Sequence, residues 1–113
     1  MTTDRAASSL FAHRLKAARL ALGISQMELG IQAGIDEASA SARINQYERG
    51  KHTPDFLTVC NLARVLCVPT AYFYAEDEHL AELIDLFGHL RSAERKTLLD
   101  FAATLPSKKK GGT

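Results

Sequence analysis

Apolar residues along this chain recur at intervals of three and four positions rather than two, and this spacing predicts α-helices throughout. Glycines and prolines interrupt the pattern where helices should end. They stand at Gly23, Gly34, Gly50, Pro54, Pro69, Gly88 and Pro106. The segments between them are short, so we expect an all-α globular bundle rather than a coiled coil or an α/β protein.

Start and stop signals predict two helices in the first third of the chain. The first runs from about Ser9 to Leu22, with Gly23 as its stop. Ser25 begins the S-x-x-E pattern of a capping box, which predicts a second helix over 26–33. The residues expected to be buried from these two helices are Phe11, Leu15, Ala18, Leu22, Met27, Leu29 and Ala33.

Three further helices are predicted up to about residue 75. Asp36 caps the third, which runs to about Arg49. Asp55 caps the fourth, and Val68-Pro69 starts a short fifth one. Helical geometry turns one face of the third helix inward, made of Ala40, Ile44 and Tyr47. The apolar face of the fourth is expected from Leu57, Cys60, Leu62, Ala63 and Leu66.

Several short motifs occur in a specific order and spacing. They are Gly23-Ile24-Ser25-Gln26-x-x-Leu29, then Gly34-Ile35, then Ile44-x-x-Tyr47-Glu48-Arg49-Gly50-Lys51-x-x-Pro54. Over about Phe11 to Tyr74 the chain resembles the helix-turn-helix domain of the phage-repressor, Cro and Xre family of bacterial and phage regulators. The resemblance implies a five-helix, lambda-repressor-like bundle. It also implies a transcriptional regulator, a repressor, that reads the major groove of double-stranded DNA with its third helix.

The family places particular side chains at the DNA backbone and between its helices. The position that opens the second helix is Gln26, and the resemblance implies that its amide and side chain contact a phosphate. Arg19 and Glu48 match the family's ion pair between the first and third helices, so Glu48 is expected to be structural. Arg49, Lys51 and Thr53 match the end of the third helix and the loop after it, where the family contacts the backbone.

The outer face of the third helix is expected to read bases. Ser41, Ala42 and Gln46 match the family's base-reading positions, and Asn45 joins them because it shares their face. Asn and Gln can bond adenine bidentately, and Arg can bond guanine in the same way. Arg43 has three interpretations: it reads a base, it clamps a phosphate, or it is a solvated helix residue.

The chain departs from the family spacing at one place. About four extra residues lie between Gly34 and Glu48, and they fall on Asp36–Ser39. Four residues are close to one helical turn, so an added turn at the start of the third helix would preserve the facing of everything after it. A longer loop is the alternative. The cap chemistry of these residues, without Gly or Pro, favours the added turn.

A helical extension is predicted after this domain, with helices over 76–90 and 92–105, the second capped by Ser92 and with Arg95 facing solvent. Its two apolar stripes are Leu80, Leu83, Ile84, Phe87 and Leu90, and Leu98, Leu99, Phe101 and Leu105. One small hairpin cannot bury both stripes alone, so it should pack on the domain or on a second copy. We favour a homodimer through 76–105, which would pair two reading helices on an inverted-repeat operator.

The expected organisation has four parts. These are a flexible N-terminus at 1–9, a helix-turn-helix domain at 10–75, the helical extension at 76–105, and a disordered basic tail at 106–113. The net charge of +1 is small for a nucleic-acid binder, but its distribution is uneven. Residues 1–75 carry +2, the extension −4 and the tail +3. A mildly basic front followed by an acidic segment suits a binding domain with a separate attachment.

Other function classes find little support in the sequence. We expect a cytoplasmic protein, since the N-terminus has no apolar run behind its charges and no segment has the length of a membrane span. Cys60 and Cys67 are interpreted as buried thiols. The four histidines are scattered and no metal-binding or phosphate-cradling motif occurs, so neither catalysis, a metal nor a cofactor is expected. The alternative function is an antitoxin that binds a partner toxin and its own promoter.

Overall fold

The computed structural model describes the backbone of residues 2–106 and the side chains of residues 8–106, and within this range every regular element is a helix. The elements in chain order are α1 (Thr2–Leu22), α2 (Gln26–Gln32), α3 (Glu37–Glu48), α4 (Phe56–Leu66), the 3₁₀ helix η1 (Thr70–Tyr74), α5 (Glu78–Gly88) and α6 (Ser92–Thr104). The all-α expectation is confirmed.

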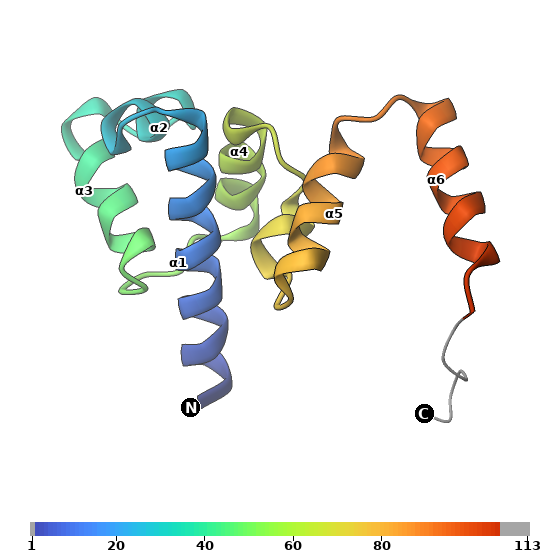
Figure 1. The fold of residues 1–113 in the computed structure, drawn as a ribbon. Coiled ribbons are helices and arrows are strands. Elements are labelled where there is room, and N and C mark those ends of the chain that lie inside the picture. The colour runs from blue at the N-terminus through green and yellow to red at the C-terminus, as the bar shows by residue number, and fades with distance from the viewer. Residues whose placement is uncertain (1, 107–113) are drawn as a thin grey trace.

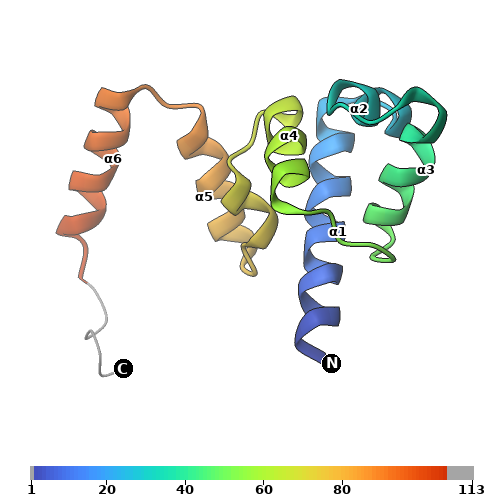
Figure 2. The ribbon, with the colours of Figure 1, turned by 180° about the vertical axis from the view of Figure 1, so that it is seen from behind.

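The helix α1 runs through the middle of the molecule and divides it (Figure 1). The pair α2 and α3 lies on one side of α1, whereas α4, η1 and α5 lie on the other. The last helix, α6, stands apart from the rest, and the reverse view shows the same separation (Figure 2). None of the residues of α6 is buried.

Three of the predicted caps are confirmed by hydrogen bonds from the first turn of each helix. The hydroxyl of Ser25 accepts from the Glu28 amide at 3.0 Å, and the Glu28 carboxylate accepts from the Ser25 amide at 2.9 Å. The Asp36 and Asp55 carboxylates accept from backbone amides of α3 and α4 at 3.3 and 2.9 Å. Each bond satisfies an amide that lacks a partner within the helix, so local sequence sets these helix starts.

One predicted helix start is wrong, and the predicted short fifth helix is present but of the 3₁₀ type. The flexible N-terminus expected at 1–9 is helical from Thr2 onward, because neither glycine nor proline interrupts this segment and Ala6 and Ala7 favour helix. The fifth element is a single 3₁₀ segment in which the Tyr72 amide donates to the Pro69 carbonyl at 3.0 Å. Five residues are too few for a regular α-helix. Residues 107–113 of the predicted tail lie outside the described range.

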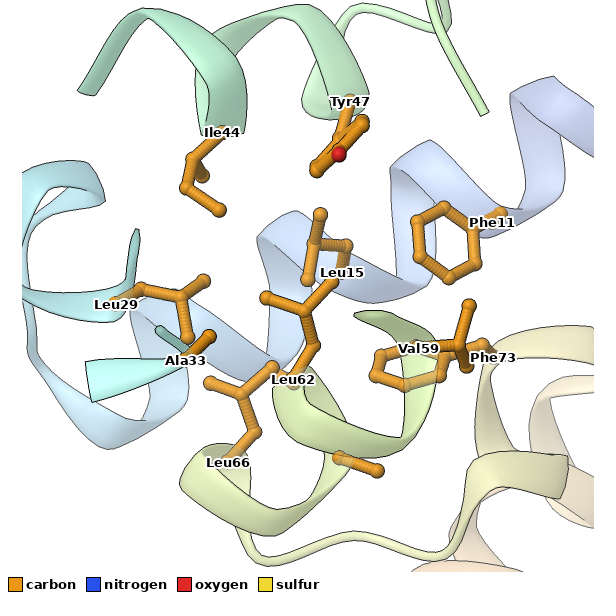
Figure 3. Packing of buried hydrophobic residues seen from close by; sticks show 12 residues of the cluster. Phe11, Leu15, Leu29, Ala33, Ile44, Tyr47, Val59, Leu62, Leu66 and Phe73 are labelled. Atoms are coloured by element: carbon orange, nitrogen blue, oxygen red, sulfur yellow. The ribbon is translucent and has the colours of Figure 1, made fainter. Parts of the chain in front are cut away.

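The core lies where α1, α2, α3, α4 and η1 meet (Figure 3). Its largest apolar members, each almost fully buried, are Phe11, Leu15, Leu29, Ile44, Val59, Leu62 and Phe73. The rings of Phe11 and Phe73 lie 4.9 Å apart at 51°, which joins α1 to η1. This contact closes the domain across 62 residues of sequence and fixes η1 as the edge from which the extension begins.

Some residues expected inside are exposed, and helix geometry explains why. The buried stripe of α4 is Val59, Leu62, Ala63 and Leu66, and Leu57 lies about 200° around the helix from Val59. Leu22 and Met27 are exposed where the chain turns from α1 into α2. Cys60 is half-buried and Cys67 is exposed at the end of α4, so the expectation of two buried thiols is wrong.

The extension also differs from expectation in its details. Arg91, not Ser92, is the N-cap of α6, because the Glu94 carboxylate closes the first turn by accepting from the Arg91 amide at 2.9 Å. Arg95 is half-buried rather than solvated, and it donates to the Phe87 and Gly88 carbonyls at 3.0 and 3.2 Å. A cation is favourable beside the carbonyls that end α5.

The close approach of α2 and α3 depends on Gly30, which is buried in the middle of α2. A Cβ atom at this position would lie 2.7 Å from the Cβ of Ala40 and 2.9 Å from the Ala40 carbonyl oxygen. We expect Gly30→Ala to lower the free energy of unfolding by about 1–3 kcal/mol, because backbone atoms of α3 would have to shift. Urea unfolding monitored by circular dichroism measures this change. Ile31→Ala, at the exposed neighbouring position, is the control and should cost far less; equal stability of Gly30→Ala and the wild type would contradict the packing argument.

Candidate nucleic-acid interface

The first turn of α3 contains the residues that exceed the family spacing. Asp36 is the N-cap, and Glu37–Ser39 are helical. The added turn is therefore confirmed and the longer loop is wrong. Because one whole turn has been added, the residues after it keep the facing that an unextended helix would have.

The helix α3 has two opposite faces, one buried and one exposed. Ala40, Ile44 and Tyr47 are buried in the core, as predicted (Figure 3). The other face is turned to solvent and displays Ser41, Ala42, Arg43, Gln46 and Arg49. Tyr47 is thus a core residue whose ring is unavailable for stacking on a base.

A bidentate ion pair holds α3 against α1. The Nε and Nη2 atoms of Arg19 donate to the two carboxylate oxygens of Glu48 at 2.6 and 3.0 Å, and Nη1 donates to the Ile24 carbonyl at 3.0 Å. The Glu48 side chain is only 3 % exposed. The hydrogen bonds with Glu48 raise the pKa of Arg19 above its usual range, so the guanidinium remains charged. The negative charge at the end of α3 is therefore neutralised where DNA would approach.

Gln26 extends this ion pair into a network that also includes α2. Its Nε2 atom donates to the Glu48 Oε1 atom at 3.1 Å and to the Asn45 Oδ1 atom at 3.3 Å. The Gln26 and Asn45 side chains are both half-buried. Asn45 therefore lies at the margin of the outer face, beside α2, and not in its middle.

The loop after α3 begins with a well-formed helix end. Gly50 has φ +71°, its amide donates to the Tyr47 carbonyl at 3.1 Å, and the Lys51 amide donates to the Gln46 carbonyl at 2.9 Å. This pair of bonds is a Schellman motif, which favours glycine at the left-handed position. It fixes the backbone of Lys51 directly after the end of α3. Thr53 is held farther along, where its hydroxyl lies 2.8 Å from that of Ser8.

Exposed cations surround this side of the molecule. Arg43, Arg49 and Lys51 are exposed, and a groove between α1 and the end of α3 is lined partly by Lys16 and Arg49.

Within residues 8–106 no group of three His, Cys, Asp or Glu side chains could hold a metal ion. None of the described helices is long and apolar enough to cross a membrane.

Comparison with known proteins agrees with this geometry. The sequence pattern of a family described as a helix-turn-helix domain matches residues 10–72, more than half of the chain. The chain belongs to the helix-turn-helix domain family. Among solved structures, the chain is similar to the crystal structure of the transcriptional regulator BswR, with 49% identity and a TM-score of 0.77. The alignment covers 83% of this chain and 93% of that one, a larger share than residues 10–72 alone. No curated protein matches the chain.

In this helix-turn-helix domain the predicted site residues fall into two groups. Three predicted base contacts, Ser41, Ala42 and Gln46, share the exposed side of α3 with Arg43, for which three roles were open, and with the predicted phosphate contact Arg49. Lys51 follows directly. Gln26 and Asn45 bond to each other at the α2–α3 contact instead of standing free. Sequence reasoning missed this bond, and only the position of Gln26 at the start of α2 and the facing of Asn45 could have suggested it.

The pairing of Arg19 with Glu48 makes a stability prediction for the helix-turn-helix domain. Glu48→Ala leaves the Arg19 guanidinium partly buried without its carboxylate, and we expect a loss of about 3 kcal/mol in the free energy of unfolding. Chemical denaturation measures the change. Glu37→Ala removes an exposed carboxylate from the same helix and is the matched control. Similar small losses in both variants would contradict a bracing role for Glu48.

Proposed function

We propose that this protein is a sequence-specific, double-stranded-DNA-binding transcriptional regulator, a cytoplasmic repressor, that reads the major groove with the outer face of α3. Membership of the helix-turn-helix family and similarity to a transcriptional regulator support DNA binding and regulation as the general function. The observation that carries the finer proposal is the two-faced α3, with a buried inner side and a polar outer side, braced by Arg19 and Glu48.

The outer face of α3 has the chemistry of a base-reading surface. The Gln46 amide can both donate to and accept from adenine, and the Ala42 methyl can touch a thymine methyl. Ser41 is small enough to let the backbone approach the base edges. Arg43 lies at the margin, where its length reaches either a guanine or a phosphate. Asn45 is oriented by Gln26 and adds a further amide beside Ser41.

Phosphate contacts would hold α3 at a fixed depth in the groove. Arg49 and Lys51 supply positive charge at the end of α3, and the Thr53 hydroxyl lies in the loop that follows. Gln26 stands at the start of α2, where free amides attract an anion. The two hydrogens of its amide nitrogen bond to Glu48 and Asn45, so its side chain contacts a phosphate while keeping its bond to Glu48 only when the phosphate replaces Asn45 as acceptor. Repression needs nothing beyond occupancy of a promoter, which DNA binding by this domain would supply.

The apolar residues that α5 and α6 leave exposed support the proposal of a homodimer through 76–105. On α5, Leu80 and Leu83 are each 46% exposed; Phe101 on α6 and Leu105 directly after it are 60% and 51% exposed. An isolated helix of the length of α6 is marginal in water, so it needs a partner surface. A second copy supplies one by symmetry, since each chain brings both stripes. The paired domains would then read an inverted repeat.

Selection of binding sites from random duplexes by the purified protein tests the proposed function. We expect enrichment of an inverted-repeat motif. Enrichment of no motif would contradict specific regulation. Co-purification with a small basic partner would favour the alternative antitoxin function.

Two single substitutions test the assignment of roles on the selected duplex. Gln46→Ala should cost about 1–3 kcal/mol of binding free energy and relax the preference at one base pair. Lys51→Ala should weaken binding to all sequences alike and reduce its salt dependence. Titrations on the selected duplex and on single-base variants measure both. Equal, sequence-independent losses in the two variants would overturn the assigned reading face.

Charged substitutions in the exposed stripes test the dimer. We expect Leu83→Glu and Phe101→Glu each to convert a dimer into a monomer in light scattering, because a buried carboxylate without a partner is unfavourable. Glu82→Gln, on the polar side of α5, is the control and should stay dimeric. A monomeric wild type, or dimers that survive both substitutions, would show that these stripes do not pair two copies.

A further inference from the structure

Among residues 8–106, Arg14 is the only charged residue that is buried as a whole, at 2% exposure. Its Nε and Nη2 atoms donate to the Ala75 carbonyl at 3.0 and 2.6 Å, and its Nη1 atom donates to the Glu78 Oε1 atom at 2.9 Å. The guanidinium carbon lies 5.9 Å from the centre of the Tyr72 ring. Glu78 is exposed, and its bond with Arg14 lowers the pKa of the carboxyl, so it stays charged.

The partners of Arg14 mark the junction between the helix-turn-helix domain and the extension. Ala75 ends η1, Glu78 is the first residue of α5, and only two residues lie between them. Arg14 therefore bonds to the residue before and to the residue after the segment 76–77, through which the chain leaves the domain. A buried guanidinium with its donors engaged is costly to release, so this junction resists bending.

Five residues later, the helix α1 makes a second interhelical contact, the ion pair of Arg19 with Glu48 of α3. Five residues rotate a helix by about 140° and advance it by about 7.5 Å. Arg14 and Arg19 thus point to different sides of α1, one toward α5 and the other toward α3. These contacts connect α3, the proposed reading helix, to the extension through the single helix α1.

We propose that Arg14 is a positioning residue that sets the spacing between the two half-sites of the operator. It does so by fixing the angle at which α5, and with it the surface that pairs two copies, leaves the reading domain. The inference rests on the proposed function. Because adjacent base pairs are rotated by about 34–36° and displaced by about 3.4 Å, a rigid dimer accepts one spacing, whereas a flexible junction accepts several.

Affinity for a series of duplexes with different spacers tests the inference. Each duplex carries two copies of the selected half-site, and a duplex with a single half-site measures the reading domain alone. We expect wild-type protein to bind the best spacing about 100-fold more tightly than the single half-site and to lose most of this gain when a few base pairs are added. Arg14→Met should retain dimerisation and half-site affinity but lose about tenfold at the best spacing, with a flattened profile.

Glu78→Ala is a second, milder variant, because its side chain is exposed and its loss leaves the core intact. It should flatten the profile less than Arg14→Met. Glu82→Ala removes an exposed carboxylate one turn later on α5 and should keep the wild-type profile. Circular dichroism melting and light scattering establish that each variant is folded and dimeric.

Three results would contradict the positioning role of Arg14, and a fourth would contradict the proposed function as well. A sharp wild-type profile retained by folded Arg14→Met and Glu78→Ala dimers would overturn the positioning role. An equal loss on the single half-site and on every spacing would also overturn it, because Arg14 would then act on reading itself. Half-site binding by the wild type without any spacing preference would overturn the role of Arg14 alone, whereas failure of the wild type to bind the half-site would overturn the proposed function as well.

Discussion

The contact between the Arg19 guanidinium and the Glu48 carboxylate sets the position of α3 relative to α1, and the exposed face of α3 depends on it. Two nearly parallel hydrogen bonds fix both distance and orientation between α1 and the end of α3, which apolar packing of Ile44 and Tyr47 alone would leave free to slide. A buried ion pair adds little net stability because desolvation offsets the attraction. Its contribution is geometric: it defines one position of α3, and it neutralises a negative charge on the surface proposed to face phosphates.

A buried polar side chain also fixes the relative position of two segments at the start of the extension. The core cluster of aromatic and aliphatic side chains supplies most of the apolar burial, yet the orientation of the extension depends on Arg14 and its bonds to Ala75 and Glu78. Among the described residues no buried side-chain nitrogen or oxygen lacks a hydrogen-bond partner. In a small domain, where the apolar core alone tolerates repacking, such satisfied polar contacts restrict the fold to one arrangement.

Local signals made the starts of α2, α3 and α4 and the inner face of α3 predictable from the sequence. Ser25, Asp36 and Asp55 cap helices through bonds to amides two or three residues away, and Ala40, Ile44 and Tyr47 share a face by periodicity alone. The ion pair of Arg19 and Glu48 was accessible only through the resemblance to a known family. The remaining features arise from contacts between distant segments.

Those distant contacts explain what sequence reasoning missed. The close approach at Gly30 and Ala40 gives no periodic signal, and a glycine inside a helix is equally consistent with poor helix formation. Arg14 does carry a signal, since it lies within the apolar stripe of Phe11, Leu15 and Ala18. That position implies burial, but the partners that make burial favourable lie more than sixty residues away.

The helix α6 keeps no buried residue of its own, and this has a consequence for how the protein would respond to its own abundance. When α6 is ordered only against a second copy, its folding free energy is part of the association free energy. In the proposed dimer model, chains at low abundance would be single and would bind DNA weakly. Promoter occupancy then rises faster than in proportion to the number of molecules, because the pairing step must be completed before two half-sites are held together. An incomplete helical surface would in this way give the regulator a concentration threshold without an effector ligand.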